Sequence, residues 1–197
     1  MADININSIW EDLSNQIKNC SKCILCKTRK NVVIGEGRRE NCKLVIIGEG
    51  PGETEDEQGR PFVGRAGDLL TRFLNDARIP RDSIYITNIV KCRPPENRDP
   101  AKDETLACSD FLESQLLLLR PSLVITLGNP ATKWFLGTSQ GITRVRGNWV
   151  DWRGIQLMPT FHPSYILRQK IASEYNNLVA SVRKDFASAR MKLDALK

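Results

Sequence analysis

Histidine is nearly absent from this 197-residue chain, which has a single one, and aromatic residues make up only 7% of it. No apolar run approaches the ~20 residues that a membrane span needs. The first residues, MADININSIWEDLSNQ, lack the basic start and apolar core of a signal peptide. Repeats, low-complexity tracts and Ser/Gly linkers are also missing, so we expect a single domain over residues 1–197. These absences argue against membrane and secreted proteins and predict a cytoplasmic, intracellular one.

Basic residues and cysteines, in contrast, are plentiful. Lys and Arg number 29 against 23 Asp and Glu, a formal charge of +6, which suits a polyanionic partner such as nucleic acid, although many basic proteins bind none. The chain also has six cysteines. Disulfides are disfavoured in the cytosol, so cysteines at short spacings indicate a metal or iron–sulfur site rather than a disulfide framework.

Apolar runs rich in β-branched residues alternate with amphipathic stretches. The expected strands cover residues 43–48, 84–90, 123–127 and 155–161, and the expected helices cover 64–77, 99–120, the region of Trp134 and the tail from Ser173. Asp99 is the expected N-cap of the second helix, with Pro100 in its first turn. This alternation predicts an α/β fold with a mostly parallel sheet and helices on both faces. Ligands bind such folds at the carboxyl ends of strands, which here are the loops after Ile47, Ile89 and Phe161.

The cysteine spacing suggests a four-thiolate site. Cys20 and Cys23 form a CxxC pair before the first strand, Cys92 follows the second strand, and Cys108 lies in the next helix. Cys26 opens an alternative, because it extends the pair to a CxxCxxC run like that of bacterial ferredoxins. The fourth cysteine followed by proline that completes the ferredoxin pattern is missing. Spacing alone does not distinguish zinc from an iron–sulfur cluster.

Two loops at the expected carboxyl edge carry unusual residues. The segment GEGPGETED (48–56) matches neither a dinucleotide loop nor a phosphate-binding P-loop, and taken alone it slightly favours a solvated acidic turn. Phe62 lies in the Gly/Pro-rich continuation, where an aromatic ring suits a stacking platform better than a core. His162 directly follows the fourth strand, where it could donate to a ligand oxygen, although a lone histidine is more often structural.

These segments together resemble the family 4 uracil-DNA glycosylases, the iron–sulfur branch of the uracil-DNA glycosylase superfamily. The resemblance is carried by GEGPGETEDEQGRPFVGRAG (48–67), TNIVKCRPPENRDP (87–100), HPSYILR (162–168) and the separate cysteines. It implies an α/β three-layer sandwich with a central four-stranded parallel sheet and helices on both faces. It also implies a [4Fe-4S] cluster held by Cys20, Cys23, Cys92 and Cys108. Cys26 and Cys42 would then be spare thiols.

The implied activity is DNA repair. Such an enzyme flips uracil out of single- or double-stranded DNA and hydrolyses its N-glycosidic bond, leaving an abasic site. Phe62 would stack on the uracil ring, Asn88 would read N3–H and O4 and so reject cytosine, and His162 would donate to O2. The backbone that would line the pocket floor belongs to Glu49, Gly50 and Pro51. We expect the enzyme to be a monofunctional monomer associated with DNA.

The chain departs from the better-known family 1 enzymes at the residues that position the attacking water and exclude thymine. Gly50 and Gly52 stand where those enzymes have a water-positioning aspartate and a thymine-excluding tyrosine. We therefore expect an ionised Glu49 to orient the water. The further candidates for that role are Glu55 and Asp56. The candidates for excluding the methyl group of thymine are Glu53 and Glu55.

The resemblance also implies how DNA is held. Ile166 and Leu167 would enter the duplex and fill the space of the flipped base, while Arg168 would hold a phosphate, with help from Arg65 and Lys91. Two other functions are weighed against this one: an iron–sulfur electron carrier, and a non-catalytic iron–sulfur nucleic-acid-binding module. The electron carrier would leave the basic charge and the set of Glu49, Phe62, Asn88 and His162 without a use, and a uracil-release assay separates the glycosylase from both alternatives.

Overall fold

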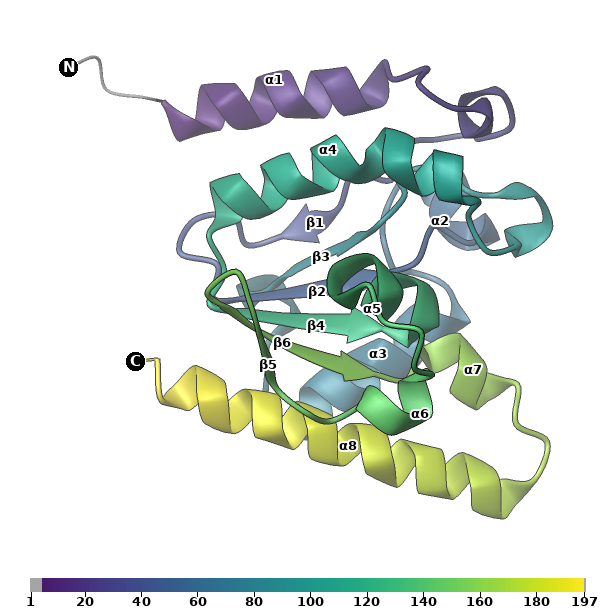
Figure 1. The fold of residues 1–197 in the computed structure, drawn as a ribbon, viewed down its shortest axis with the longest axis vertical. Coiled ribbons are helices and arrows are strands. Elements are labelled where there is room, and N and C mark those ends of the chain that lie inside the picture. Colours follow the sequence, from purple (N-terminus) through teal and green to yellow (C-terminus); the bar gives the residue numbers. More distant parts are fainter. Residues whose placement is uncertain (1–4, 197) are drawn as a thin grey trace.

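Six strands form one sheet in the computed structural model, which describes residues 5–196 (Figure 1). The strands are β1 (Glu36–Gly37), β2 (Leu44–Gly48), β3 (Tyr85–Asn88), β4 (Leu123–Leu127), β5 (Val150–Trp152) and β6 (Ile155–Thr160). The α-helices are α1 (Ile6–Lys18), α2 (Glu53–Gln58), α3 (Arg65–Asp76), α4 (Lys102–Leu119), α5 (Gly128–Leu136), α6 (Ile142–Val145), α7 (Pro163–Leu167) and α8 (Ala172–Asp194). Short 3-10 turns cover Ile24–Lys27, Arg81–Ser83 and Pro95–Asn97. Within residues 5–196, no helix is both long and apolar enough to cross a membrane.

The sheet is larger than the sequence predicts. Its strand order is β1-β3-β2-β4-β6-β5, and the inner strands β3, β2, β4 and β6 pair in parallel. The edge strands β1 and β5 pair antiparallel to β3 and β6. The two edge strands were not predicted, because β1 has two residues and β5 three, too few to show a strand pattern in sequence.

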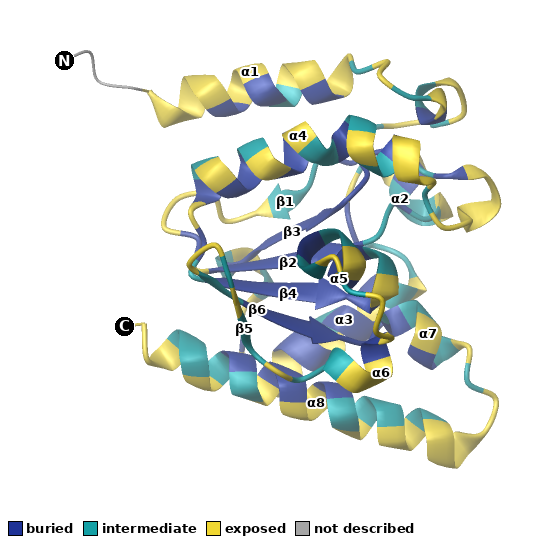
Figure 2. Cartoon of the chain, viewed as in Figure 1, coloured by how far each residue is buried: buried dark blue, intermediate teal, exposed yellow. Residues whose placement is uncertain are grey.

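Helices cover both faces of the sheet, as Figures 1 and 2 show. Every residue of β2 is buried, which explains its uninterrupted apolar run. Its side chains alternate between two cores: Leu44 and Ile46 pack with residues of α3 and α8, and Val45 and Ile47 pack with residues of α1 and α4. The sheet is therefore the middle layer of a three-layer sandwich.

The start of α4 differs from the prediction. The helix begins at Lys102 with Ala101 at the N-cap, so the expectation that Asp99 caps it was wrong. The Glu104 carboxylate caps it instead: it accepts the Ala101 backbone N–H at 2.7 Å and binds the Arg98 guanidinium at 2.6 and 2.8 Å. Asp99 is thereby free of a capping role, and its loop runs along the carboxyl edge of the sheet.

Candidate active site

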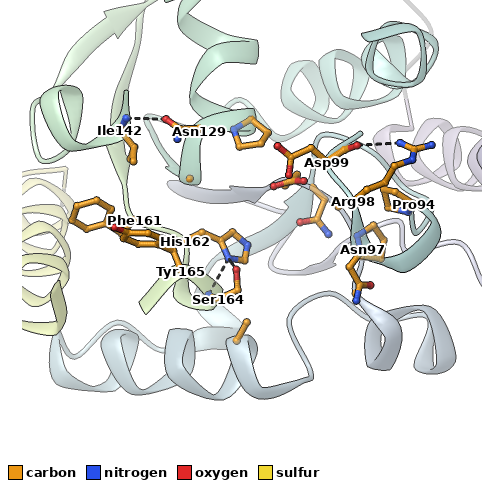
Figure 3. A pocket seen from close by; sticks show the side chains of 18 of the residues that line it. Pro94, Asn97, Arg98, Asp99, Asn129, Ile142, Phe161, His162, Ser164 and Tyr165 are labelled. Atoms are coloured by element: carbon orange, nitrogen blue, oxygen red, sulfur yellow. Dashed lines mark hydrogen bonds between the residues drawn. The ribbon is translucent and has the colours of Figure 1, made fainter. Parts of the chain in front are cut away.

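A cavity of about 580 Å³ opens at the carboxyl edge of the parallel strands (Figure 3). It is lined by residues 49–52 after β2, Asn88 at the end of β3, residues 128–130 after β4 and residues 161–162 after β6, together with Phe62 and the loop residues 97–99. The three predicted loops thus meet at one place. The sequence analysis missed the loop after β4, because nothing in Gly128-Asn129-Pro130 identifies a ligand site.

Asn88 brings an unused hydrogen-bond acceptor to this cavity. The residue is 1% exposed. Among the residues that the structure describes, its Oδ1 is the buried side-chain polar atom that has no hydrogen-bond partner. Burying such an atom unpaired costs about 1–3 kcal/mol. A ligand that donates an N–H here would remove that cost.

Phe62 is both core and cavity wall. It is 6% exposed and packs in the core, so the expectation that it is a platform rather than core was only half right. Its ring lies 5.7 Å from the His162 ring at an interplanar angle of 34°. Gly48 makes this arrangement possible: a Cβ there would lie 2.6 Å from Phe62 Cζ and would also collide with Asn88 Oδ1. The sequence analysis gave Gly48 no role, because the need for a glycine arises only from these two neighbours.

His162 stands at the N-terminus of α7 and points into the cavity (Figure 3). Its Nδ1 accepts the Ser164 backbone N–H at 3.1 Å and lies 2.7 Å from Ser164 Oγ. Burial, helped by the charge of Arg168, lowers the pKa of His162 to about 4, so the ring is neutral at pH 7. Because a backbone N–H can only donate, Nδ1 carries no proton and the neutral ring carries it on Nε2. His162 is therefore a neutral hydrogen-bond donor through Nε2, held in this tautomer by its contact with Ser164.

Glu49 differs from the expectation of a fully ionised carboxylate. Burial, followed by the charge and hydrogen bond of the neighbouring Asp99 carboxyl, raises the pKa of Glu49 to about 7, and Arg168 opposes the shift. The carboxyl of Glu49 therefore binds a proton more readily than that of an exposed glutamate. Asp99 points into the same cavity (Figure 3) and was missed as a site residue because its sequence context resembles an N-cap.

Glu55 has a positioning task in the cavity wall. Its Oε1 accepts the backbone N–H groups of Val63 and Gly64 at 2.9 and 2.8 Å, and its Oε2 accepts that of Gly52 at 3.2 Å. The carboxylate thereby ties the loop after β2 to the loop that carries Phe62. This bonding leaves it poorly placed to orient water, although it does line the cavity.

Two other acidic candidates lie away from the cavity. Asp56 is 2% exposed and accepts the backbone N–H groups of Lys30 and Asn31 at 3.0 and 3.2 Å, so it was wrong as a candidate for orienting water. The Glu53 side chain is 67% exposed and pairs with Arg93 at 3.3 Å, so it was wrong as a candidate for excluding thymine. The sequence placed all of these carboxylates in one loop, but α2 turns them in different directions.

The expected DNA-entering residues also separate. Ile166 is 0% exposed and belongs to the core, so its assignment as a residue that enters the duplex was wrong. Leu167 is partly exposed and packs against the same core. Arg168 is exposed at the cavity, and so is Tyr165, whose ring lies 5.6 Å from that of Phe161. The helical turn of α7 decides which of these side chains face out.

The two further basic residues have different surroundings. Arg65 is exposed at the start of α3, and its phosphate contact stays a prediction. Lys91 is 1% exposed, so its assignment as a phosphate contact was wrong. Its Nζ is enclosed by oxygen atoms of Thr87, Asn88 and Gln115.

A second, small cavity is lined by cysteines. The five that surround it are Cys20, Cys23, Cys26, Cys92 and Cys108. In the described part of the chain, no three His, Cys, Asp or Glu side chains converge closely enough to hold a single metal ion. The Arg29 guanidinium lies beside these thiols and donates to Cys92 Sγ at 3.1 Å and to the Cys20 carbonyl at 2.9 Å. Cys42 lies elsewhere and donates to the Leu44 carbonyl at 3.3 Å.

The sequence of this chain is similar to those of known proteins. Residues 34–187 match the family model of the uracil DNA glycosylase superfamily. The chain is similar to the type-4 uracil-DNA glycosylase of Thermotoga maritima, with 46% identity over 92% of this chain and 93% of that protein. It is also similar to those of Saccharolobus solfataricus and Sulfurisphaera tokodaii, each 40% identical over 93% and 91% of this chain and over 86% and 83% of the relative.

Proposed function

The chain belongs to the type-4 uracil-DNA glycosylases of the uracil-DNA glycosylase superfamily, and we propose that its larger cavity removes uracil from DNA. The observation that carries this proposal is the unpartnered Oδ1 of Asn88 beside the Phe62 ring. A base paired in a duplex is out of reach of such a cavity, so the uracil is flipped into it. The products are free uracil and an abasic site.

Base selection follows from the Asn88 amide. Its Oδ1 accepts the N3–H of uracil, and its NH2 group donates to O4. Cytosine presents an acceptor at N3 and an amino group at position 4, so both contacts would be unpaired or repulsive. Phe62 stacks on the ring, and the backbone of Gly50 and Pro51 lines the floor of the pocket.

Bond cleavage uses the two groups with shifted pKa values. As the C1′–N1 bond breaks, the electron pair moves to the uracil ring, and His162 Nε2–H stabilises the charge that grows on O2. A deprotonated Glu49 orients the water that adds to C1′, accepts the proton that this water loses, and stabilises the cationic sugar. Because this role needs the carboxylate, the raised pKa of Glu49 makes the reaction slower below about pH 7.

We further propose that the cysteine cavity holds a [4Fe-4S] cluster through Cys20, Cys23, Cys92 and Cys108. Four thiolates from three segments surrounding a space, rather than converging on a point, fit a cluster better than a single ion. Arg29 fits the negative charge of such a group. The cluster would cross-link the amino-terminal segment, the loop after β3 and α4. Cys26 lines the same cavity and is the alternative ligand.

DNA would be gripped at the mouth of the larger cavity. We propose that the single domain acts as a monomer on single- and double-stranded DNA. Leu167 on α7 would enter the space that the flipped base leaves, and Arg168 would bind a phosphate. Because such contacts release counterions, binding should weaken steeply as salt is raised.

The test is uracil release from single- and double-stranded DNA under single-turnover conditions, with thymine-containing DNA as the control substrate. His162→Ala should slow release by about 10²–10³-fold, the usual cost of one preorganised donor, while DNA binding is kept. An electron carrier or a non-catalytic binding module would release no uracil at all. A fully active His162→Ala variant would contradict the proposed stabilisation of the leaving group.

A further inference from the structure

Lys91 is buried between the two cavities. It is 1% exposed, and its Nζ donates to Thr87 Oγ1 at 2.7 Å, to the Asn88 carbonyl at 2.8 Å and to Gln115 Oε1 at 2.7 Å. All three ammonium protons are therefore used, and every acceptor is a neutral oxygen. A side chain held this completely is rigid and cannot serve a surface ligand.

The backbone of Lys91 belongs to the cysteine cavity. Lys91 lines that cavity together with Cys108, and its carbonyl accepts the Val33 N–H at 2.8 Å. The next residue in the chain is Cys92. The backbone of Lys91 thus contacts the amino-terminal segment, while its side chain contacts α4 through Gln115 and the end of β3 through Thr87 and Asn88.

The side chain of Asn88 is not held in place through its own Oδ1, because that atom has no partner among the described residues. Its position depends on the backbone instead. On one side the sheet fixes it, since Asn88 pairs with Gly48 in the parallel ladder of β2 and β3. On the other side Lys91 Nζ holds its carbonyl. Removing the second support would let the amide move within the cavity.

We propose that Lys91 is a positioning residue for Asn88 that fixes the uracil-reading amide against the scaffold of the cysteine cavity. The inference rests on the proposed function. It gives the cysteine cavity a role in base selection, in addition to cross-linking the fold. The change that tests it is Lys91→Met, which keeps an unbranched apolar side chain of similar length and removes all three donors.

The experiment measures two quantities on the purified holoprotein. The first is single-turnover uracil release. The second is the ratio of affinities for two duplexes, one with non-cleavable 2′-fluoro-2′-deoxyuridine and one with cytosine at the same position. Lys91→Met should lower both by about tenfold, the cost of one lost hydrogen bond to a base. The absorbance of the cluster per chain, near ~400 nm, should stay at the parent value.

A double-mutant cycle with Asn88→Ala shows whether Lys91 acts through that residue. If it does, Lys91→Met should cause no further loss once the amide has been removed. Equal tenfold losses in both backgrounds would overturn the proposal. Thr87→Val is a milder variant that removes one acceptor of the ammonium group, and a several-fold fall in the affinity ratio is expected. If Lys91→Met does not fold, the Thr87→Val variant is used in its place.

Two controls separate positioning from general destabilisation. Lys192→Met removes another lysine that donates to a glutamine. Lys192 lies on α8, and its Nζ donates to Gln156 Oε1 at 3.2 Å. Val182→Ala truncates a core side chain of α8 that is 1% exposed. Both should keep the parent affinity ratio. If Val182→Ala lowered the ratio as Lys91→Met does, Lys91 would be merely structural. If the parent protein released no uracil, the proposed function itself would fail.

Discussion

The two cavities of this molecule lie on either side of the segment 88–92 and are built in different ways. The larger one is formed by residues that follow the ends of four parallel strands, so the topology of the sheet brings them together. The cysteine cavity lies outside the sheet, between the amino-terminal segment, the loop after β3 and α4. The position of the first therefore follows from strand order, whereas that of the second depends on how helices and loops pack.

The two cavities also differ in the charged groups that line them. In the larger one, burial moves Glu49 and His162 towards their neutral forms, because it raises the pKa of Glu49 and lowers that of His162. In the cysteine cavity, Arg29 places a cation against the thiols. The first site thus offers a neutral donor, His162, to the charge that develops on the uracil ring at the transition state. The second is suited to a permanently negative group.

Gly48→Ala should have the largest effect on the larger cavity. The new Cβ would displace both the Phe62 ring and the Asn88 amide, so we expect uracil release to fall by about 10³-fold, while the visible absorption of the proposed cluster is kept. Gly141→Ala is a matched control, because its Cβ would meet only Thr143 Oγ1, at 3.8 Å, and it should cost far less. Parent-level activity in Gly48→Ala would show that the close packing of Phe62 and Asn88 against residue 48 is not needed for uracil release.

The next largest effect concerns the cysteine cavity. Serine at Cys20, Cys23, Cys92 or Cys108 should bleach the protein and lower its iron content from about four per chain, as a four-thiolate cluster implies. Cys42→Ser should keep both, because that thiol lies outside the cavity. Iron analysis and visible absorption measure the outcome. Loss of iron in Cys26→Ser with retention in Cys108→Ser would assign the cluster to the CxxCxxC run.

A smaller effect is expected on the pH profile of the larger cavity. Glu49 has a raised pKa of about 7, so the single-turnover rate should fall about tenfold per pH unit below that value and level off above it. Asp99→Asn removes one cause of the shift, so the midpoint should move to lower pH and the rate at pH 6 should rise several-fold. Glu49→Gln should be slow and independent of pH over this range. A midpoint unchanged in Asp99→Asn would mean that burial alone sets it.

The smallest effect on activity is expected at the mouth of the larger cavity. Leu167→Ala should slow release from duplex DNA several-fold more than release from single strands, because only the duplex must be opened. Ile166→Ala should instead cost about 2–5 kcal/mol of folding stability, since its side chain is fully buried. Rates on both substrates and thermal melting separate the two variants. Equal losses on both substrates in Leu167→Ala would show that α7 does not enter the duplex.

The sequence predicted elements best where the pattern was long and uninterrupted. The inner strands were found because they are apolar runs, buried on both faces. The edge strands were missed because they are short. Asp99 was misassigned because Asp before a helical pattern is a strong N-cap signal, whereas the cap is completed by Glu104 from inside the helix.

The sequence by itself determined the family, the parallel inner strands and the loops that meet at the larger cavity, because motif spacing and strand order are properties of the chain. Only the tertiary structure decided what the individual side chains do there. Ile166 and Lys91 are buried, Glu55 and Asp56 are bound to backbone donors, and Glu49 has a raised pKa. Burial, hydrogen bonding and pKa depend on atoms from distant segments, which no local pattern records.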